Sequence, residues 1–460
     1  MTGFLTLDTL AQAVDAHEID TVIVAAVDMQ GRLMGKRFHA AHFVSHGWQE
    51  THCCNYLLTT DMEMNTVPGY ASASWQQGYG DYVMRPDLVT LRRVPWLEAT
   101  ALVLCDLLDH HSHEEVPQSP RAILKRQIAR AREMGFDAMM ATELEFYVFD
   151  NSYDALRADF DNGSGPSKLH PISSYNEDYH IFQTTKEEPL MRRLRNGLYG
   201  AGIEVENTKG EADAGQAEVN VHYADALTTA DNHVIIKTAT KEIAHAQGQS
   251  VTFMAKYDTA KAGSSSHVHQ SLWTLDGAPA FRDPSDPLGM SELMKHFLAG
   301  QLTHAREITL MLAPYVNSYK RFCVGLFAPT KAVWSPDNRT AGFRVCGENT
   351  GGVRVECRIG GADLNPYIAC AALLAAGLDG IEQKMPLEPA MVGDMYAAEE
   401  ARDIPTTLRE AVEIAEGSAW LRAAFGDAVV DHYVHAARWE ILETDRVVTD
   451  WELRRGLERA

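Results

Sequence analysis

Three short segments of this chain repeat one alternation: a residue suited to binding a metal or an anion, one spacer, and a second such residue. They are Glu143-Leu-Glu145, His267-Val-His269 and Glu356-Cys-Arg358. On a β-strand, residues two apart point to the same face, so each doublet directs two polar groups to one side. The leucine, valine and cysteine spacers then face an apolar layer. The alternation therefore predicts a sheet whose polar face carries a binding site.

An acidic pair, Glu211 and Glu218, adds to these doublets and brackets a segment that can reverse the chain. Taken singly, each doublet is more typical of a solvated strand face, of histidines hydrogen-bonded on a sheet, or of an ordinary ion pair. Carboxylates and imidazoles that converge on one cavity are instead what Mg²⁺ or Mn²⁺ requires, whereas a zinc site would favour cysteine and more histidine.

The size and charge of the chain limit the classes of function. Its 460 residues suggest two domains, and we place the boundary in a loop rich in His, Glu and Pro, giving domains 1–115 and 116–460. A net charge of −22 argues against binding nucleic acid or an anionic membrane surface. The longest apolar run is about a dozen residues, too short for a bilayer. Seven cysteines without a C-x-x-C pair and no visible secretory signal indicate a cytoplasmic protein.

The pattern of apolar residues predicts an α+β fold with an antiparallel or mixed sheet. Residues 20–28 and 33–38 read as a hairpin, and residues 88–107 as two further strands. Ser119 and Pro120 open a helix that runs to about Met134. Further strands are predicted over residues 143–149, 217–223, 251–256 and 266–273, and further helices over 188–202, 229–249, 291–312, 366–383 and from 406 onward. A P-loop and a G-x-G-x-x-G dinucleotide motif are absent from the sequence.

Arginines are dense in one stretch of an otherwise acidic chain. Guanidinium groups match carboxylate and phosphate oxygens in bidentate fashion, so this density suggests an internal anion site rather than a solvated surface. Within residues 321–358 the arginines considered are Arg321, Arg339, Arg344, Arg354 and Arg358.

Together these segments resemble the glutamine synthetase family of the class I type, in order and spacing from about residue 20 to the end. The resemblance implies a small N-terminal β-grasp-like domain and a large catalytic domain. It rests on Thr142-Glu-Leu-Glu145, Gly210-Glu-Ala-Asp-Ala-Gly-Gln-Ala-Glu218, Thr252-Phe-Met-Ala-Lys256, His267-Val-His-Gln-Ser271, Asn317-Ser-Tyr-Lys-Arg321, Asn338-Arg339, Arg354-Val-Glu-Cys-Arg358 and Asn365-Pro-Tyr367.

The resemblance implies a role for each matching residue. ATP would phosphorylate the γ-carboxylate of L-glutamate, and an amine would then attack the γ-glutamyl phosphate, with two or three Mg²⁺ or Mn²⁺ ions at the phosphates. One ion would be held by Glu145, Glu211 and Glu218, and the other by Glu143, His267 and Glu356. The nucleotide would contact Glu206, Tyr223, His269, Ser271, Arg344 and Arg354. Glutamate and the transferring phosphoryl group would contact Gly263, Arg321, Arg339 and Arg358.

The chain departs from this family where ammonium would bind. Glutamine synthetases carry a glutamate in a Gly-x-Glu-Ala-Pro flap, whereas this chain has Phe327 at that position. A phenyl ring cannot accept a proton from ammonium, but it can contact a carbon-bearing amine. The Asp-Gly-Ser-Ser motif of the family is also missing, and Asp61 or Glu63 stands in that region.

These departures predict a glutamate–amine ligase that makes a γ-glutamylated alkylamine, ethanolamine or polyamine. One alternative is a glutamine synthetase whose ammonium site is rebuilt from Asp61 or Glu63, and another is an inactive regulatory relative. The resemblance also implies a homododecamer of two stacked hexameric rings. In such rings Asp61 and Glu63 would act on the active site of a neighbouring subunit.

Overall fold

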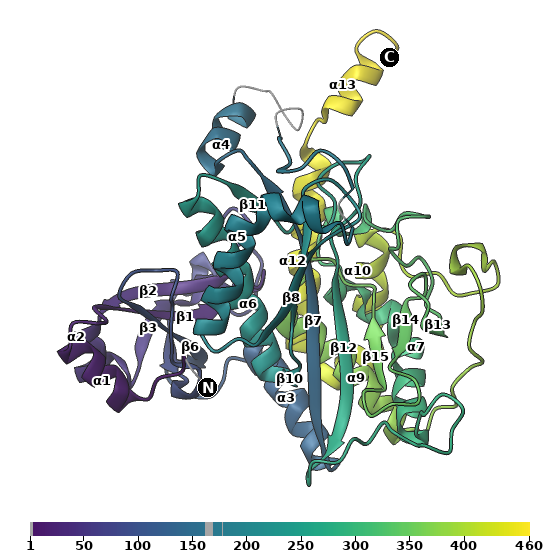
Figure 1. Cartoon of the computed structure of the whole chain (residues 1–460), viewed down its shortest axis with the longest axis horizontal. Coiled ribbons are helices and arrows are strands. Elements are labelled where there is room, and N and C mark those ends of the chain that lie inside the picture. Colours follow the sequence, from purple (N-terminus) through teal and green to yellow (C-terminus); the bar gives the residue numbers. More distant parts are fainter. Residues whose placement is uncertain (1–2, 162–168, 177) are drawn as a thin grey trace.

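The chain forms two β-sheets, one within residues 21–109 and the other within residues 136–357 (Figure 1). The computed structural model describes residues 3–161, 169–176 and 178–460. In the first sheet the strand order is β2-β1-β6-β4-β3, and β5 pairs with β6. The strands of the first sheet are β1 (Thr21–Val27), β2 (Leu33–His39), β3 (Thr51–Cys54), β4 (Asp81–Pro86), β5 (Arg92–Arg93) and β6 (Thr100–Asp109).

The turn between β1 and β2 is built around the carboxylate of Asp28. This carboxylate accepts hydrogen bonds from the backbone N–H groups of Gln30 and Arg32, at 3.0 and 2.8 Å, and from Arg32 Nε at 2.7 Å. Gly31 supplies the positive φ of 75° that the turn requires. The two strands pair antiparallel from Thr21 to Val27, which confirms the predicted hairpin.

The second sheet is the larger one, and β7 is its central strand. Its strand order is β13-β14-β15-β12-β7-β9-β8, and β10 and β11 also pair with β7. All of its pairings are antiparallel except that between β13 and β14, which confirms the predicted antiparallel or mixed sheet. Its strands are β7 (Phe136–Phe149), β8 (Val205–Gly210), β9 (Gln216–Val221), β10 (Ala224–Asp225), β11 (Ser250–Thr252), β12 (Ser266–Thr274), β13 (Trp334–Pro336), β14 (Phe343–Cys346) and β15 (Arg354–Cys357).

Helices pack around the two sheets and complete an α+β fold, as predicted. The α9 helix packs against α3 and α7, and it is buried along almost its whole length. None of the helices in the described residues is long and apolar enough to cross a membrane. The helices are α1 (Leu7–Asp15), α2 (Ala40–His42), α3 (Pro120–Glu133), α4 (Tyr153–Asp161), α5 (Ile181–Gly200), α6 (Ala226–Ala246), α7 (Glu292–Leu312), α8 (Val316–Tyr319), α9 (Pro366–Glu382), α10 (Leu408–Gly417), α11 (Ala419–Phe425), α12 (Asp427–Arg446) and α13 (Asp450–Gly456).

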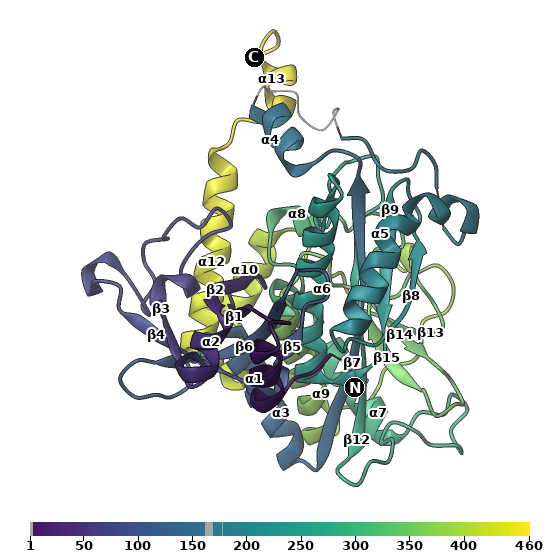
Figure 2. The same cartoon turned by 60° about the vertical axis from the view of Figure 1, so that its left-hand side comes forward.

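The α12 helix lies between the cores of the two sheets (Figure 2). Val430 and Val434 belong to the core under the large sheet, whereas Tyr433 and Trp439 pack against the core of the first sheet. The predicted boundary between residues 115 and 116 falls in the segment between β6 and α3. The division into two domains, and the β-grasp-like character of the first, stay predictions.

Several predicted element ends were wrong. The strand predicted from residue 143 begins at Phe136, because its ladder with β12 extends that far. The helix predicted from residue 188 begins at Ile181, with Pro189 inside it. The strand predicted over residues 251–256 ends at Thr252. Two strands, β5 and β6, begin within residues 88–107 as predicted, although β5 has only two residues. The start of α3 is also confirmed, since Ser119 is its N-cap and Pro120 its first residue, although the Ser119 side chain makes no capping hydrogen bond.

Candidate functional site

The register of the large sheet brings the alternating doublets together. On one side of β7, Glu143 lies opposite His267 of β12; on the other side, Glu145 lies opposite Glu218 of β9. The spacer Leu144 is buried in the apolar core, as the alternation predicts. One strand therefore presents two carboxylates to the same face, each beside a different neighbouring strand.

The first cluster consists of three carboxylates. Oxygen atoms of Glu145, Glu211 and Glu218 lie within 4.8 Å of one another. Glu145 accepts hydrogen bonds from the backbone N–H of Ser265 at 2.8 Å and from its hydroxyl. Burial raises the pKa of Glu145 and of Glu218, and repulsion from the other carboxylates raises both further. This cluster therefore contains more negative charge than its protein surroundings neutralise.

The second cluster mixes carboxylates with imidazoles. Glu143, His269 and Glu356 have ligand atoms within 4.8 Å of one another. His267 Nδ1 lies 2.9 Å from Glu143 Oε2 and 3.4 Å from Glu356 Oε1. Both histidines therefore contact Glu143, although the sequence assigned His267 to the ion and His269 to the nucleotide. That assignment stays a prediction.

Neighbouring groups oppose the effect of burial on the two carboxylates of this second cluster. Burial alone would raise the pKa of Glu356, but Arg358 and the two histidines hold it at about 2. The pKa of Glu143 is also lowered: burial alone would raise it, but the hydrogen bonds with both histidines outweigh the effect of burial. Burial and Arg358 lower the pKa of His267 to about 4, so this imidazole is neutral near pH 7 and can act as a metal ligand.

Both clusters fit divalent ions by their donor chemistry. The first offers only carboxylate oxygens, which Mg²⁺ and Mn²⁺ prefer. The second offers carboxylates and imidazole nitrogen, a set that Mn²⁺ and Mg²⁺ sites also use. The predicted ligand sets are thus assembled on the polar face of the sheet.

A cavity of about 510 Å³, here called the acidic cavity, opens over these clusters. The backbone at Gly263 is in close contact with the side chain of Arg321, where a Cβ would lie 2.6 Å from Arg321 Cγ. Arg344 and Arg358 both form ion pairs with Glu356. The predicted metal and substrate residues that line the cavity are Glu143, Glu145, Glu211, Glu218, Gly263, His267, Arg321, Phe327, Arg339 and Arg358. Arg344, predicted at the nucleotide, also lines it.

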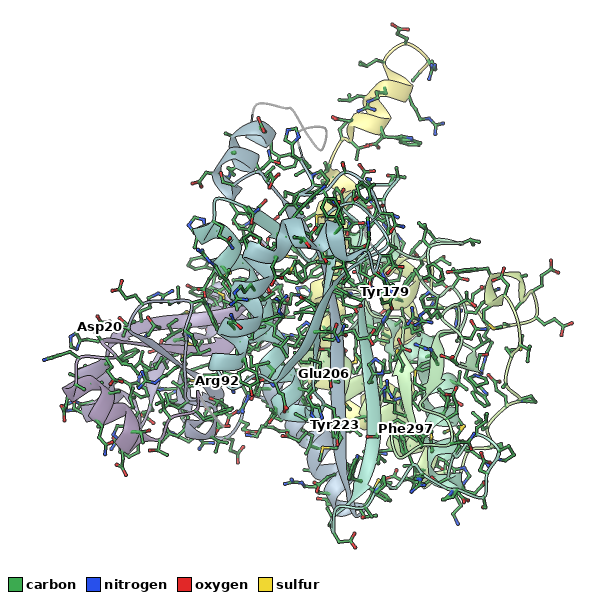
Figure 3. All side chains as sticks on the ribbon, in the orientation of Figure 1. Asp20, Arg92, Tyr179, Glu206, Tyr223 and Phe297 are labelled. Atoms are coloured by element: carbon green, nitrogen blue, oxygen red, sulfur yellow. The ribbon has the colours of Figure 1, made fainter. Side chains whose placement is uncertain are left out.

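A second cavity of about 490 Å³, here called the aromatic cavity, meets the first at Glu143. Its wall includes Tyr223, which stacks on Trp273 with ring centroids 6.2 Å apart. The flat aromatic pair beside a cluster of charged groups suits a nucleotide base next to its phosphates. Figure 3 shows Glu206 and Tyr223 on the same part of the large sheet. The predicted nucleotide residues that line the cavity are Glu206, Tyr223, His269, Ser271 and Arg354.

Phe327 lies in a loop at the edge of the acidic cavity. Its side chain is 57% exposed, its φ is +55°, and Leu326 beside it also lines the cavity. The two carboxylates predicted to act on the amine are elsewhere: Asp61 lines a separate cavity beside α12, and Glu63 lines neither of the two cavities described above. Within one chain the structure therefore does not bring Asp61 or Glu63 to Phe327.

Several residues of the site were missed by the sequence analysis. Lys209 pairs with Glu211 and Asp178, and Tyr179 lies over its ammonium group at 4.4 Å. Lys209, Asp178 and Tyr179 all line the acidic cavity. Figure 3 shows Tyr179 near one end of the strands of the large sheet. The ladder between β8 and β9 sets Lys209 opposite Glu218, which is a signal that appears only once the pairing is known. Trp273 of the aromatic cavity was missed in the same way.

Comparison with known proteins gives one consistent result. Residues 117–456 match the family described as glutamine synthetase, catalytic domain. The gamma-glutamylethanolamide synthetase GlnA4 of Streptomyces coelicolor is 48% identical over 460 residues, covering 99% of this chain and 96% of that protein. The glutamate–isopropylamine ligase of a Pseudomonas species is 37% identical over 448 residues, covering 97% of this chain and 96% of that protein. Among solved structures, a GmaS/ADP complex superposes with a TM-score of 0.83 at 27% identity, covering 98% and 99%.

Proposed function

Because this chain belongs to the glutamine synthetase family, we propose that it joins the γ-carboxylate of L-glutamate to a small primary amine. It is a ligase of the glutamine synthetase type, and the family implies the use of ATP and divalent metal ions. Ethanolamine is the first candidate for the amine, since the relative that is 48% identical is a gamma-glutamylethanolamide synthetase. Isopropylamine, other alkylamines and polyamines are the further candidates.

The observation that carries this proposal is Phe327 at the acidic cavity. The cavity contains the two clusters and the arginines that ATP and glutamate need, while the flap position offers a phenyl ring instead of a carboxylate. A phenyl ring and the neighbouring Leu326 favour contact with carbon atoms, and they give free ammonium no counter-charge. An amine with a short carbon chain therefore suits this wall better than ammonium does.

The reaction proceeds in two steps. A γ-carboxylate oxygen of glutamate attacks the terminal phosphorus of ATP, the bond from that phosphorus to the bridging oxygen breaks, and ADP leaves. The amine nitrogen then attacks the carbonyl carbon of the γ-glutamyl phosphate, phosphate leaves, and the nitrogen gives up a proton. The two clusters would hold divalent ions, which would neutralise phosphate charge. Arg339 and Arg358, which line the acidic cavity, would stabilise the negative charge that develops on the transferring phosphoryl group, and Arg321 would contact glutamate.

The amine end of the site requires a second chain in this proposal. Asp61 or Glu63 of one subunit would reach the acidic cavity of the next and accept the proton of the amine. A homododecamer of two stacked hexameric rings would provide that arrangement. We place the enzyme in the cytoplasm, where ATP and glutamate are available and thiols stay reduced.

The test is phosphate release that depends on ATP, glutamate and Mg²⁺, measured across ammonium, methylamine, ethanolamine, isopropylamine, putrescine and spermine. Mass spectrometry of the product identifies the γ-glutamylamide. We expect ethanolamine to give the highest kcat/KM and ammonium the lowest. Preference for ammonium at modest concentration would overturn the proposal.

Phe327→Glu provides the variant for the same assay. A carboxylate at the flap should raise kcat/KM for ammonium by about tenfold, because it adds a charge-assisted hydrogen bond to the cation. Phe327→Leu is the matched control, since it keeps the position apolar and should leave the ranking of amines unchanged. An unaltered ranking in Phe327→Glu would exclude this residue from amine selection.

A further inference from the structure

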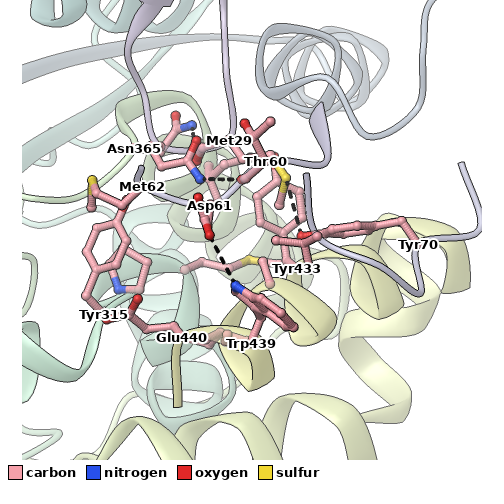
Figure 4. A pocket seen from close by; sticks show the side chains of 18 residues that line it. Met29, Thr60, Asp61, Met62, Tyr70, Tyr315, Asn365, Tyr433, Trp439 and Glu440 are labelled. Atoms are coloured by element: carbon pink, nitrogen blue, oxygen red, sulfur yellow. Dashed lines mark hydrogen bonds between the residues drawn. The ribbon is translucent and has the colours of Figure 1, made fainter. Parts of the chain in front are cut away.

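A third cavity lies beside α12, between that helix and the first sheet (Figure 4). Its volume is about 70 Å³. One buried water needs only about 10–15 Å³ of such space, so a molecule of several non-hydrogen atoms fits. We call it the α12 cavity. Among the described residues, no residue that lines it also lines the acidic or the aromatic cavity.

Aromatic rings form much of the wall of the α12 cavity. Tyr315, Tyr433 and Trp439 approach from the helical side, and Tyr70 closes it from the side of the first sheet. The thioether of Met29 completes this wall and accepts a hydrogen bond from the Tyr70 hydroxyl at 3.9 Å. The faces of such rings are negative and polarisable, so they attract organic cations within about 6 Å.

Two carboxylates, Asp61 and Glu440, also line the α12 cavity. Asp61 accepts hydrogen bonds from the indole N–H of Trp439 at 3.3 Å and from the backbone N–H of Asn65 at 2.8 Å. In the described part of the chain, neither carboxylate forms an ion pair with a lysine, arginine or histidine. The nearby guanidinium of Arg32 is already bonded to Asp28. The cavity thus has two negative groups and no positive partner for them.

Other acidic groups near the cavity repel the negative charge of Glu440. Burial raises the pKa of Glu440, and the negative charges of Glu63, Asp61 and Asp363 raise it further. Burial also raises the pKa of Tyr315, with Asp28, Asp363 and Glu440 adding to the shift and Arg32 opposing it. A cation entering the cavity would therefore meet a favourable potential from several directions.

We propose that the α12 cavity binds a small organic ammonium ion, with Asp61 and Glu440 as counter-ions and Trp439 and Tyr315 against its carbon atoms. A bare divalent ion fits less well, because rings and thioethers replace most of the six or more oxygens that it prefers. The bound ion would join the loop that carries Asp61 to α12. This inference goes beyond the proposed function, since it concerns binding without chemistry at a place apart from the acidic cavity. It assigns Asp61 to this ion, and it leaves Glu63 as the carboxylate that would act on the acidic cavity of the next subunit.

Isothermal titration of the full chain tests the proposal, with a metal chelator present and without ATP or glutamate. Ethanolamine is the probe, and ethylene glycol, of nearly the same shape but uncharged, is its control. We expect one ethanolamine per chain and no heat from ethylene glycol. Glu440→Gln should weaken ethanolamine binding about tenfold, because it removes a charged hydrogen-bond partner. Glu443→Gln, the same change three residues along α12, should leave binding unaltered.

Two further variants separate this site from the acidic cavity and guard against misfolding. Phe327→Ala should leave ethanolamine binding unaltered, whereas Trp439→Leu should weaken it about fivefold through loss of the ring face; thermal unfolding verifies that each variant is folded. Three results would overturn the inference: no binding of ethanolamine, equal binding of ethanolamine and ethylene glycol, or binding that is weakened by Phe327→Ala but not by Glu440→Gln.

The same measurements separate the two proposals. If the enzyme turns over ethanolamine but does not bind it in the α12 cavity, only the proposed function holds. If it binds ethanolamine in the α12 cavity but does not turn it over, only this inference holds.

Discussion

The two ligand clusters on the large sheet lie side by side yet have opposite charge balances. The cluster of Glu145, Glu211 and Glu218 contains carboxylates that repel one another, and the pKa values of Glu145 and Glu218 are raised. In the cluster around Glu356 the effect of burial is outweighed by neighbouring groups, the Arg358 guanidinium first among them, and the pKa of Glu356 is lowered to about 2. An added cation should therefore stabilise the first cluster more than the second.

The largest expected effect concerns Glu356, the buried counter-ion of two arginines. Glu356→Gln should lower the free energy of unfolding of the metal-free protein by about 3–5 kcal/mol, because Arg344 and Arg358 would keep their charge without a buried partner. Denaturant unfolding with a chelator present measures this change. Glu413→Gln, on an exposed part of α10, is the control and should change stability little. Similar stability of the two variants would contradict the neutralised character of the second cluster.

Magnesium should act mainly through the first cluster. Mg²⁺ at one hundred times its dissociation constant from the folded protein should raise the free energy of unfolding of the unaltered chain by about 2.7 kcal/mol, because the ion binds only the folded state. Glu218→Gln should abolish most of that increase by removing one of the three carboxylates. Unfolding curves with and without Mg²⁺ give both values. A full magnesium effect in Glu218→Gln would place the stabilising ion elsewhere.

The pH dependence of the metal-free protein should also distinguish the clusters. Raised native pKa values mean that Glu145 and Glu218 hold protons more tightly when folded, so their contribution is largest below the ordinary carboxyl pKa of 4.5 and is lost at higher pH. Stability should therefore fall by about 1–2 kcal/mol between about pH 5 and about pH 9. The lowered pKa of Glu356 acts in the opposite sense, and its contribution disappears only as the pH falls below 4.5 toward about 2. Thermal unfolding measured across these pH ranges, with a chelator present, reports both the loss of stability at high pH and the loss at low pH.

The smallest expected effect is a gain in stability. In the metal-free protein, Glu218→Gln should raise the free energy of unfolding by about 1 kcal/mol at neutral pH, since it removes one of three repelling charges. The same substitution should flatten the fall in stability between about pH 5 and about pH 9. Denaturant unfolding at both ends of that range checks the two statements. Loss of stability in this variant would mean that Lys209 and Asn220 already compensate the cluster.

The sequence predicted the shared face of each doublet because strand geometry is local, whereas the two ligand sets followed from the family resemblance. Residues two apart on a strand must share a face, so Glu143 and Glu145 could be recognised as a pair before any pairing was known. Lys209 and Trp273 also lie two residues from predicted site residues, Glu211 and Ser271, and contact them. That local spacing could have suggested them, whereas the contacts of Lys209 with Glu218 and of Trp273 with Tyr223 depend on the pairing and packing of the strands. The roles of His267 and His269 could not be separated either, because both point to Glu143.

The fold was predicted at the level of elements, and its errors have physical causes. The helix was predicted from residue 188, yet α5 begins seven residues earlier at Ile181 and includes Pro189, and Gln183 and Glu187 of this first stretch are buried. The first part of β7 has fewer aromatic residues than its second part, and it is a strand because β12 pairs with it as far as Phe136. In both cases contacts distant in sequence extended an element beyond its local signal.

One consequence of β7 concerns what can occupy both clusters at once. Glu143 and Glu145 are two residues apart on an antiparallel strand, which advances about 3.4 Å per residue, so their backbones are about 7 Å apart. Ions that share a single bridging oxygen lie only about 3.5–4 Å apart. A ligand with several oxygens in a row, as in a chain of phosphates, can span this distance and touch both clusters. A slip of one residue in β7 would turn both glutamates to the opposite face, so this spacing cannot be altered gradually.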